Sequence, residues 1–231
     1  MAYQSPITDL RFLMDHVVGF DAVAATERYA EATPDMVDAI LTEAAKMSDE
    51  VLAPLQRNGD LHPAVLENGV VRTSPGFADG YRAIATGGWI GMSADPENGG
   101  MGLPMSLTTA VISGEWCGTM NLTEPQAGSD VGALRSKATP NGNGSYAISG
   151  QKIYISWGDN DFTENVCHLV LARLPDGVPG TKGISLFMVP KFIPDADGNP
   201  GGRNSLRVVS LEHKLGLHGS PTAVMEYDGA T

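Results

Sequence analysis

The chain has 231 residues, a formal net charge of −12 and an apolar share of 42%. This length suffices for one large or two small domains, and the apolar share supports a buried core and argues against disorder. The acidic balance argues against a nucleic-acid-binding face and against binding to an anionic membrane surface. No apolar run approaches the roughly 20 residues that are needed to cross a bilayer. No secretion signal opens the chain, so a cytoplasmic protein is the expectation.

The first ninety residues have the spacing of amphipathic helices. Each of three stripes begins with a serine or threonine followed by proline, the usual N-cap and N1 residues, and continues with apolar residues at helical intervals. The predicted helices follow Ser5-Pro6, Thr33-Pro34 and Ser74-Pro75 and end at Gly19, Pro54 and Gly87. We assign these stripes to core packing, without chemistry.

From Trp116 onward the hydrophobic period changes to two, which predicts strands. Asn141-Gly142 is a hairpin signal, and turn residues separate the runs with no helical pattern between them. The predicted strands cover residues 116–122, 134–139, 145–156, 166–173, 184–189, 206–211 and 223–227. The fold class is therefore α+β, with an N-terminal helical domain over residues 1–111 and an all-β, barrel-like middle domain over residues 112–231.

Common catalytic and metal-binding patterns are missing. Cys117 and Cys167 have neither a CxxC nor a zinc spacing, so buried, reduced thiols are expected. The five histidines never adopt the i,i+4 spacing of helical metal ligands, and no glycine-rich run has a Rossmann or P-loop context. We predict no metal site.

Residues 120–130, Met-Asn-Leu-Thr-Glu-Pro-Gln-Ala-Gly-Ser-Asp, leave an apolar run through a sharp turn. Pro125 and Gly128 force the turn, and the hydroxyls of Thr123 and Ser129 share one small surface with unpaired backbone N–H groups. This combination suits an anionic, hydrogen-bonding cofactor better than a metal or a nucleophile. An ordinary polar loop between strands has the same composition, so the pattern alone leaves both interpretations open.

The order of these residues resembles the signature of the acyl-CoA dehydrogenase flavoproteins, in which a strand enters a Thr-Glu-Pro turn and leaves through Ala-Gly-Ser-Asp. Residues 150–156, Gly-Gln-Lys-Ile-Tyr-Ile-Ser, resemble the second half of that signature. Residues 215–222 resemble a subgroup that includes 3-methylmercaptopropionyl-CoA dehydrogenase. In one departure from the family, the Gly-Gly-x-Gly loop at residues 95–104 runs almost directly into residues 112–116, so part of the helical domain is expected to be lacking.

The resemblance implies an FAD cofactor and α,β-dehydrogenation of an acyl-CoA thioester, with 3-methylmercaptopropionyl-CoA as one candidate substrate. A carboxylate would remove the α-proton while the β-hydrogen leaves as hydride to flavin N5. Thr123 would bond the pyrimidine edge of the flavin, Tyr154 would pack on its ring where many relatives carry tryptophan, and Ser156 would lie near N5. The residues expected to bind the cofactor are Met120, Leu122, Thr123, Gly128, Ser129, Tyr154 and Ser156, and Ser129 is also a candidate substrate contact.

In the family, the catalytic base is a glutamate in a C-terminal helical domain. This chain stops at Thr231, where that domain would begin, so we expect it to contain no catalytic residue and to be inactive by itself. Glu124 is expected to shape the turn and not to replace the base.

The anionic substrate would need a locally basic patch. The candidate cations are Arg135, Lys137, Lys152, Arg203, Arg207 and Lys214. The family also implies an electron-transfer flavoprotein as partner and a homo-oligomeric full-length form. The competing interpretation is a non-enzymatic β-barrel binding module with a helical cap, in which the Thr-Glu-Pro loop is purely structural.

Overall fold

The computed structural model describes residues 3–27, 33–90 and 116–231. Its contacts divide the chain into two compact units, Met1–Arg57 and Asn58–Thr231. The loop predicted over residues 95–104, its junction with residues 112–115 and the domain boundary predicted at residue 111 lie outside the described residues, and that boundary stays a prediction. No helix within the described ranges is both long enough and apolar enough to span a membrane.

The first unit is helical, as its apolar spacing predicts. Gly19 ends the first helical run with a left-handed φ of 65°, and the side chain of Thr33 accepts a hydrogen bond from the backbone N–H of Met36 at the start of the next. The elements are α1 (Ile7–Leu13), the π-helical turn η1 (Met14–Val18), α2 (Phe20–Ala24), α3 (Pro34–Met47), the π-helical turn η3 (Ser48–Leu52) and α4 (Ala53–Leu61), which continues into the second unit.

The prediction that the second helix ends at Pro54 was wrong, because the chain stays helical to Leu61. Proline has no N–H to donate, and its ring crowds the carbonyl four residues earlier in a regular α-helix. The π-helical turn η3 directly precedes α4 and widens the backbone there. This local widening accommodates the proline near the start of α4.

The second unit combines one further helix with the strands, and the strands predicted after residue 140 are confirmed to within a few residues. α5 (Phe77–Thr86) starts and ends close to its predicted limits. The other elements are β1 (Val65–Glu67), β2 (Val70–Arg72), β3 (Trp116–Asn121), η4 (Val131–Ala133), β4 (Lys137–Pro140), β5 (Tyr146–Ser156), β6 (Asn165–Arg173), η5 (Thr181–Gly183), β7 (Ile184–Pro190), β8 (Phe192–Pro194), β9 (Pro200–Arg203), β10 (Leu206–Leu211) and β11 (Thr222–Ala230).

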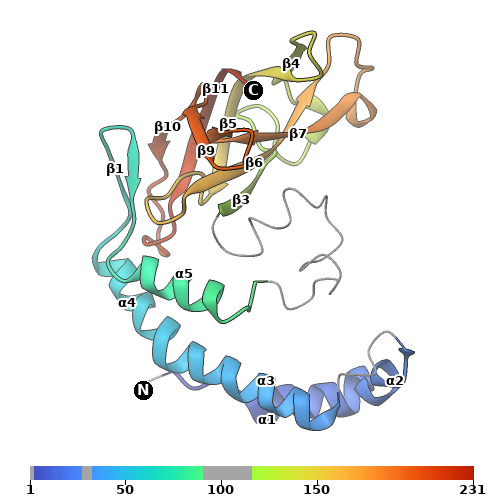
Figure 1. Ribbon diagram of the computed structural model, residues 1–231, viewed down its shortest axis with the longest axis vertical. Helices are drawn as coiled ribbons and strands as arrows, with labels where there is room; N and C mark the ends of the chain where they lie inside the picture. Colours follow the sequence, from blue (N-terminus) through green and yellow to red (C-terminus); the bar gives the residue numbers. More distant parts are fainter. Residues whose placement is uncertain (1–2, 28–32, 91–115) are drawn as a thin grey trace. The chain divides into compact units, whose positions relative to one another are not determined.

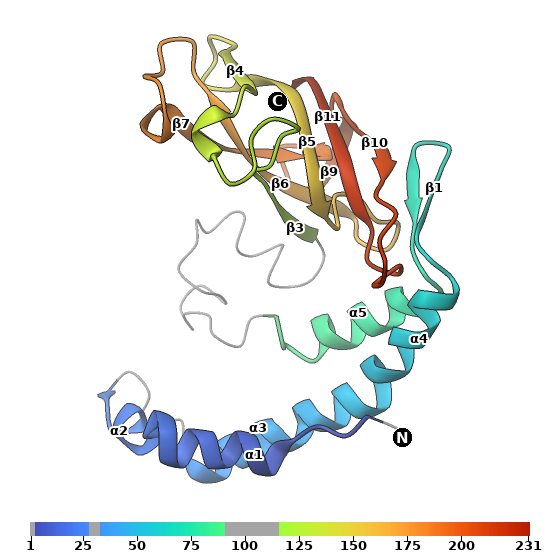
Figure 2. The same ribbon diagram turned by 180° about the vertical axis from the view of Figure 1, so that it is seen from behind.

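Seven of the described strands form one curled, half-barrel sheet in the order β10-β11-β5-β4-β6-β3, with β7 paired to β6 (Figures 1 and 2). β3 and β4 both run parallel to β6, where Asn121 pairs with Val170 and Lys137 with Arg173. The remaining pairs of this sheet are antiparallel. The segment between residues 122 and 136 therefore leaves the edge of β6 and returns to it, which makes it an excursion from the sheet.

The core of the second unit fills the curl of this sheet. Its most buried members come from β4, β5, β6, β7, β10 and β11, and Val71 of β2 joins them at 0% exposure. The β1–β2 hairpin was not predicted, although its Asn68-Gly69 turn carries a recognisable signal and both turn residues have positive φ. Phe77 and Tyr81 of α5 pack on Trp157 and Phe162, which lie in the connection after β5.

Candidate functional site

The excursion from the sheet begins with a tight turn. The backbone groups of Glu124 and Ala127 exchange two hydrogen bonds, at 2.9 and 3.0 Å, around Pro125 and Gln126. The backbone carbonyl of Thr123 accepts from the N–H of Ile153 at 2.9 Å. The strand exit is thus fastened to β5 immediately before the turn.

A buried ion pair joins the two signature segments to each other. Lys152 Nζ lies 2.8 Å from Glu124 Oε1 and also donates to the backbone carbonyl of Leu122 at 3.1 Å. The side chains of Lys152 and Glu124 are only 0% and 3% exposed. The charged residue of the first signature segment is therefore the partner of the charged residue of the second.

Glu124 also organises the far end of the excursion. Its carboxylate accepts from the backbone N–H of Arg135 at 2.6 Å and of Ser136 at 3.0 Å, and from the side-chain amide of Gln126 at 2.6 Å. Burial alone would raise the pKa of Glu124, but the hydrogen bonds from Lys152, Ser136 and Arg135 outweigh it and lower the pKa to about 2. A carboxylate held in this way stays ionised at neutral pH, so Glu124 shapes the loop and does not act as a base.

Lys152 is one of the candidate cations for an anionic substrate, and the structure gives it a different role. Burial lowers the pKa of Lys152, while the carboxylate of Glu124 counteracts that shift. With its ammonium group fully enclosed, Lys152 has no surface to offer a ligand. It fixes the position of the strand exit instead.

β5 carries a bulge next to this ion pair. The pairing of β5 with β11 shifts register between Lys152 and Ile155, and both of these side chains are buried although they are three residues apart. Between them, Tyr154 has a φ of 59° and leaves its side chain 62% exposed. A left-handed backbone is strained for an aromatic residue, and such strain is concentrated at functional sites.

Beside this bulge the structure places most of the residues predicted to bind the cofactor. Met120 is 51% exposed between the buried neighbours Thr119 and Asn121, so it points away from the core. β3 is antiparallel to β5, because both β3 and β4 follow the direction of β6. With Thr123 fastened to Ile153, the end of β5 that carries Ser156 extends toward Met120.

The predicted hydroxyl donors are free in the part of the chain that the structure describes. Thr123 is half-buried, Ser129 and Ser156 are exposed, and none of their hydroxyl groups has a hydrogen-bond partner among these residues. Gly128 and Ser129 lie in the exposed part of the excursion, where a Cβ atom built on Gly128 would lie 3.8 Å from Cγ2 of Thr123. The structure therefore brings neighbouring segments together at one site, which holds Met120, Leu122, Thr123, Gly128, Tyr154 and Ser156, and Ser129 follows Gly128 in the chain.

A cavity of about 620 Å³ lies where the excursion meets the β6–β7 connection. Arg135, Lys137 and Arg173 contribute to its lining, which contains no acidic residue. Arg173 donates to the carbonyls of Leu134, at 2.9 Å, and Gly132, and so holds the excursion against β6. Arg135 and Lys137 have no ion-pair partner within the described ranges, so their charges are available to an anionic ligand.

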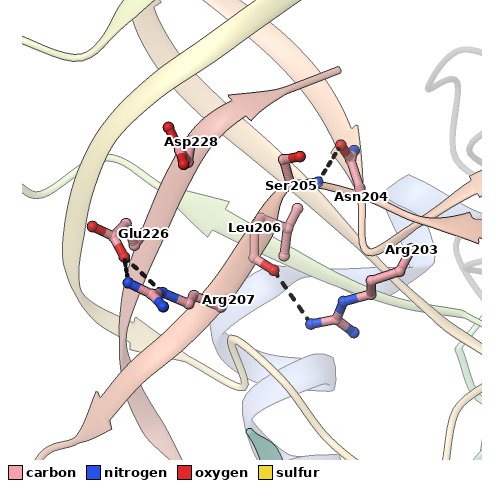
Figure 3. A pocket seen from close by; sticks show the side chains of 7 residues that line it. All are labelled: Arg203, Asn204, Ser205, Leu206, Arg207, Glu226 and Asp228. Atoms are coloured by element: carbon pink, nitrogen blue, oxygen red, sulfur yellow. Dashed lines mark hydrogen bonds and ion pairs between the residues drawn. The ribbon is translucent and has the colours of Figure 1, made fainter.

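Two other candidate cations line a second cavity, of about 360 Å³, beside β10 and β11 (Figure 3). Arg207 is paired there with Glu226, through a hydrogen bond from Nε of 2.7 Å, and Arg203 donates to the carbonyl of Leu206. Glu226 and Asp228 line the same cavity and offset the positive charge. This second cavity is therefore a poorer match to an anion than the first.

The last candidate cation, Lys214, donates to the carbonyl of Ser220 and to the hydroxyl of Thr222 at 3.2 Å. Burial lowers its pKa. Lys214 thus holds the connection between β10 and β11 together. Of the six cations proposed from the sequence, Arg135 and Lys137 alone line a described cavity that is free of acidic side chains.

Sequence reasoning missed the Glu124–Lys152 pair and the anchoring role of Arg173. A signal for the pair was present, because Lys152 continues the alternation of Ile148 and Gly150 along β5 and so occupies an inward position. A lysine on the core face of a strand needs an acidic partner. Nothing in the local sequence marks the anchoring role of Arg173, because the two carbonyls that it holds in the excursion lie about forty residues earlier.

Within the described ranges, no group of three or more histidine, cysteine, aspartate or glutamate side chains is arranged to bind a metal ion. Cys117 and Cys167 are free thiols, and burial raises the pKa of both. The site as described offers hydroxyl groups, an exposed aromatic ring and two cations without an ion-pair partner among the described residues.

The chain is similar to known proteins of one family. Residues 119–230 match the family model described as the acyl-CoA dehydrogenase middle domain. The chain is 41% identical to 3-methylmercaptopropionyl-CoA dehydrogenase of Ruegeria pomeroyi, over 100% of this chain and 46% of the relative. It is 32% identical to the broad-specificity linear acyl-CoA dehydrogenase FadE5 of Mycobacterium tuberculosis, over 97% of this chain and 44% of the relative. The chain thus spans less than half the length of these curated relatives.

The first of these alignments runs over 272 positions, more than the 231 residues of this chain, so the relative carries residues with no counterpart here. That excess agrees with a helical domain that is partly lacking. Among solved structures, ACDH-11 of Caenorhabditis elegans in complex with C11-CoA has the same fold, with a TM-score of 0.64 at 21% identity over 84% of this chain and 41% of that chain. The signature segments, the curled sheet and the aligned relatives agree: the chain belongs to the acyl-CoA dehydrogenase family.

Proposed function

We propose that the second unit forms the flavin- and substrate-binding part of an FAD-dependent acyl-CoA dehydrogenase, which removes hydrogen from the α and β carbons of an acyl-CoA thioester. One observation carries the proposal. The Glu124–Lys152 pair joins the two signature segments through the core, while the hydroxyls of Thr123 and Ser156 and the ring of Tyr154 are left free beside it.

The donor set suits a flavin. An isoalloxazine ring has apolar faces and a polar edge, so it needs an aromatic or aliphatic surface together with a few directed donors. Met120 and Tyr154 offer such a surface, at 51% and 62% exposure. Thr123 and Ser156 offer hydroxyl donors on either side of the β5 bulge, and Ser129 offers another in the excursion.

The roles proposed for these residues follow from their chemistry. The Tyr154 ring would pack on the flavin, Thr123 would donate to its pyrimidine edge and Ser156 would donate near N5. Gly128 and Ser129 would approach the flavin phosphates or the thioester chain, with Ser129 also a substrate contact. FAD, when bound, supplies the acceptor for the hydride that leaves the β carbon.

The reaction also needs a base for the α-proton, and Glu124 is not suited to that role. Its pKa of about 2 and its four hydrogen-bond donors leave it no tendency to accept a proton at neutral pH. We propose that a carboxylate outside residues 119–230 is the base, and that the 231-residue chain by itself does not turn over.

The cavity lined by Arg135, Lys137 and Arg173 supports an acyl-CoA as the substrate, because the phosphates of coenzyme A are anionic and the cavity holds only basic charges. As the acyl-CoA we propose 3-methylmercaptopropionyl-CoA, since the Ruegeria pomeroyi relative named for that substrate aligns with the whole chain. An electron-transfer flavoprotein as electron acceptor, a homo-oligomer as the full-length form and a cytoplasmic location belong to the same proposal. The two free thiols are consistent with a reducing compartment.

Titration of the purified chain with FAD tests the proposal. We expect quenching of flavin fluorescence at saturation and a yellow protein, with weaker binding in Ser156→Ala. Ser210→Ala is the matched control, because Ser210 is also an exposed strand serine but lies on β10. If the chain does not bind FAD, or if Ser156→Ala and Ser210→Ala weaken FAD binding equally, the non-enzymatic binding module becomes the better interpretation.

A further inference from the structure

A row of buried polar side chains crosses the interior of the curled sheet. Tyr227 Oη donates to Asn121 Oδ1 at 2.9 Å, Asn121 Nδ2 donates to Thr119 Oγ1 at 2.7 Å, and Thr119 Oγ1 lies 3.1 Å from His168 Nδ1. Each of these four residues, here called the polar brace, is at most 5% exposed. β11 and β3 are not neighbours in the sheet, so the bond from Tyr227 to Asn121 spans the curl from inside.

The donor and acceptor groups fix the direction of the first two hydrogen bonds in the brace. Tyr227 donates to the amide oxygen of Asn121, which turns the amide nitrogen toward Thr119. Thr119 Oγ1 accepts from that nitrogen and keeps a proton that it can donate to His168 Nδ1, and Asn121 Nδ2 also lies 3.4 Å from Nδ1. With Nδ1 as the acceptor, the ring of His168 is neutral and carries its proton on Nε2, which has no hydrogen-bond partner among the described residues. Burial, together with the charges of Lys191 and Arg203, lowers the pKa of His168 to about 3, which agrees with a neutral ring.

The brace bears on the site because β3 is an end strand. Its ladder in the described sheet runs only along β6, and a slip of one residue would exchange the two faces of the strand. In the observed register Thr119 pairs directly with His168 and points inward, while Met120 points outward. A slipped strand would bury Met120 and leave the polar atoms of the brace unpaired, which is costly in a dry core.

We infer that the polar brace locks β3 in a single register and thereby fixes where Met120 and Thr123 are presented to FAD. Its members are positioning residues, since none of them is exposed at the site. The cofactor in this inference rests on the proposed function, whereas the register lock rests on the hydrogen bonds alone.

Two substitutions remove one hydroxyl each without emptying much volume: Tyr227→Phe and Thr119→Val. Thr119→Ser restores the hydroxyl and serves as the rescue variant. Val208→Ala is the matched control, because Val208 is buried in the same core at 5% exposure but lies on β10. The measurements are hydrogen–deuterium exchange of the β3 amides relative to those of β10, and the dissociation constant for FAD.

We expect Tyr227→Phe and Thr119→Val to speed exchange in β3 about tenfold relative to β10, and to weaken FAD binding about tenfold, since an unpaired buried polar group costs on this order. Thr119→Ser should return both values to within about twofold of the unsubstituted chain. Val208→Ala should change exchange across the whole sheet and leave FAD binding unaltered. The inference would be overturned if Tyr227→Phe and Thr119→Val had the same β3 amide exchange and the same affinity for FAD as Val208→Ala.

Failures of the two proposals are distinguishable. If the unsubstituted chain binds no FAD, the proposed cofactor is wrong, and the exchange of β3 amides alone decides whether the brace locks the register. If Tyr227→Phe does not fold, the comparison of Thr119→Val with Thr119→Ser decides, and equal β3 exchange in those two variants would refute the lock.

Discussion

Replacing Lys152 with methionine tests how much the buried ion pair stabilises the second unit. The substitution keeps an unbranched side chain of similar length but leaves Glu124 as an uncompensated carboxylate at 3% exposure. Removing one partner of a buried pair costs about 3–5 kcal/mol. Three other donors to Glu124 remain, from Arg135, Ser136 and Gln126, so we expect about 3 kcal/mol, the lower end of that range.

The free energy of unfolding, measured by urea denaturation with tryptophan fluorescence, checks this value. Lys137→Met is the control, because it removes an exposed lysine from β4 and should change stability by no more than about 0.5 kcal/mol. The double variant Lys152→Met/Glu124→Gln should recover part of the loss, since a neutral amide costs less to bury than an unpaired carboxylate. A loss below about 1 kcal/mol in Lys152→Met would refute the reasoning.

Three further predictions concern pH, strain and substrate charge. The pKa of His168 is about 3 in the folded chain, below its ordinary 6.5, so between these values the unfolded chain binds a proton that the folded chain does not. Lowering the pH to 5 should therefore lower the free energy of unfolding by about 2 kcal/mol. Urea titrations at several pH values measure this loss, and His168→Asn should flatten the pH dependence. Tyr154→Gly should keep the free energy of unfolding within about 1 kcal/mol or raise it, because glycine adopts a φ of 59° without strain, yet FAD titration should show several-fold weaker binding. The double variant Arg135→Ala/Lys137→Ala should bind coenzyme A about tenfold more weakly in low salt and lose much less affinity in high salt, because salt screens the charges of the cavity. Calorimetry measures the affinity, and a loss that does not depend on salt would contradict the assignment of this cavity to coenzyme A.

Periodicity was enough to predict most of the fold. The change from helical spacing to a period of two separates the helices from the strands after Trp116, and Gly19 and Thr33 mark real helix ends. The failures have local causes. The β1–β2 hairpin has strands of three residues each, too short to show alternation, and its Asn68-Gly69 turn was overlooked.

The start of β4 was also predicted too early. Leu134, Arg135 and Ser136 alternate like a strand, but the ladder starts at Lys137. The backbone N–H groups of Arg135 and Ser136 are taken by the carboxylate of Glu124, and the carbonyl of Leu134 is taken by Arg173. Side chains distant in sequence therefore replace the strand partners, which no local pattern can reveal.

The sequence was enough to locate the candidate site but not to predict its geometry. Its two signature segments identified the strand exit and the neighbouring strand. The bulge at Tyr154 could not be foreseen, because an unbroken alternation would have put Lys152 and Tyr154 on the same face. The register shift against β11 instead buries Lys152 and Ile155 together and turns Tyr154 outward.

The buried charges also explain how the excursion can bind a ligand without first having to become ordered. A polar excursion of about fifteen residues would ordinarily be mobile, and binding would then have to order it. Here Glu124 fastens both ends of the excursion, Lys152 holds the strand exit and Arg173 holds the return to β6. Because Glu124 and Lys152 are buried while the hydroxyls of Thr123 and Ser156 beside them are free, the donors at the surface are set in place before any ligand arrives. Substitutions at Glu124 or Lys152 should therefore weaken FAD binding without removing a direct contact to it.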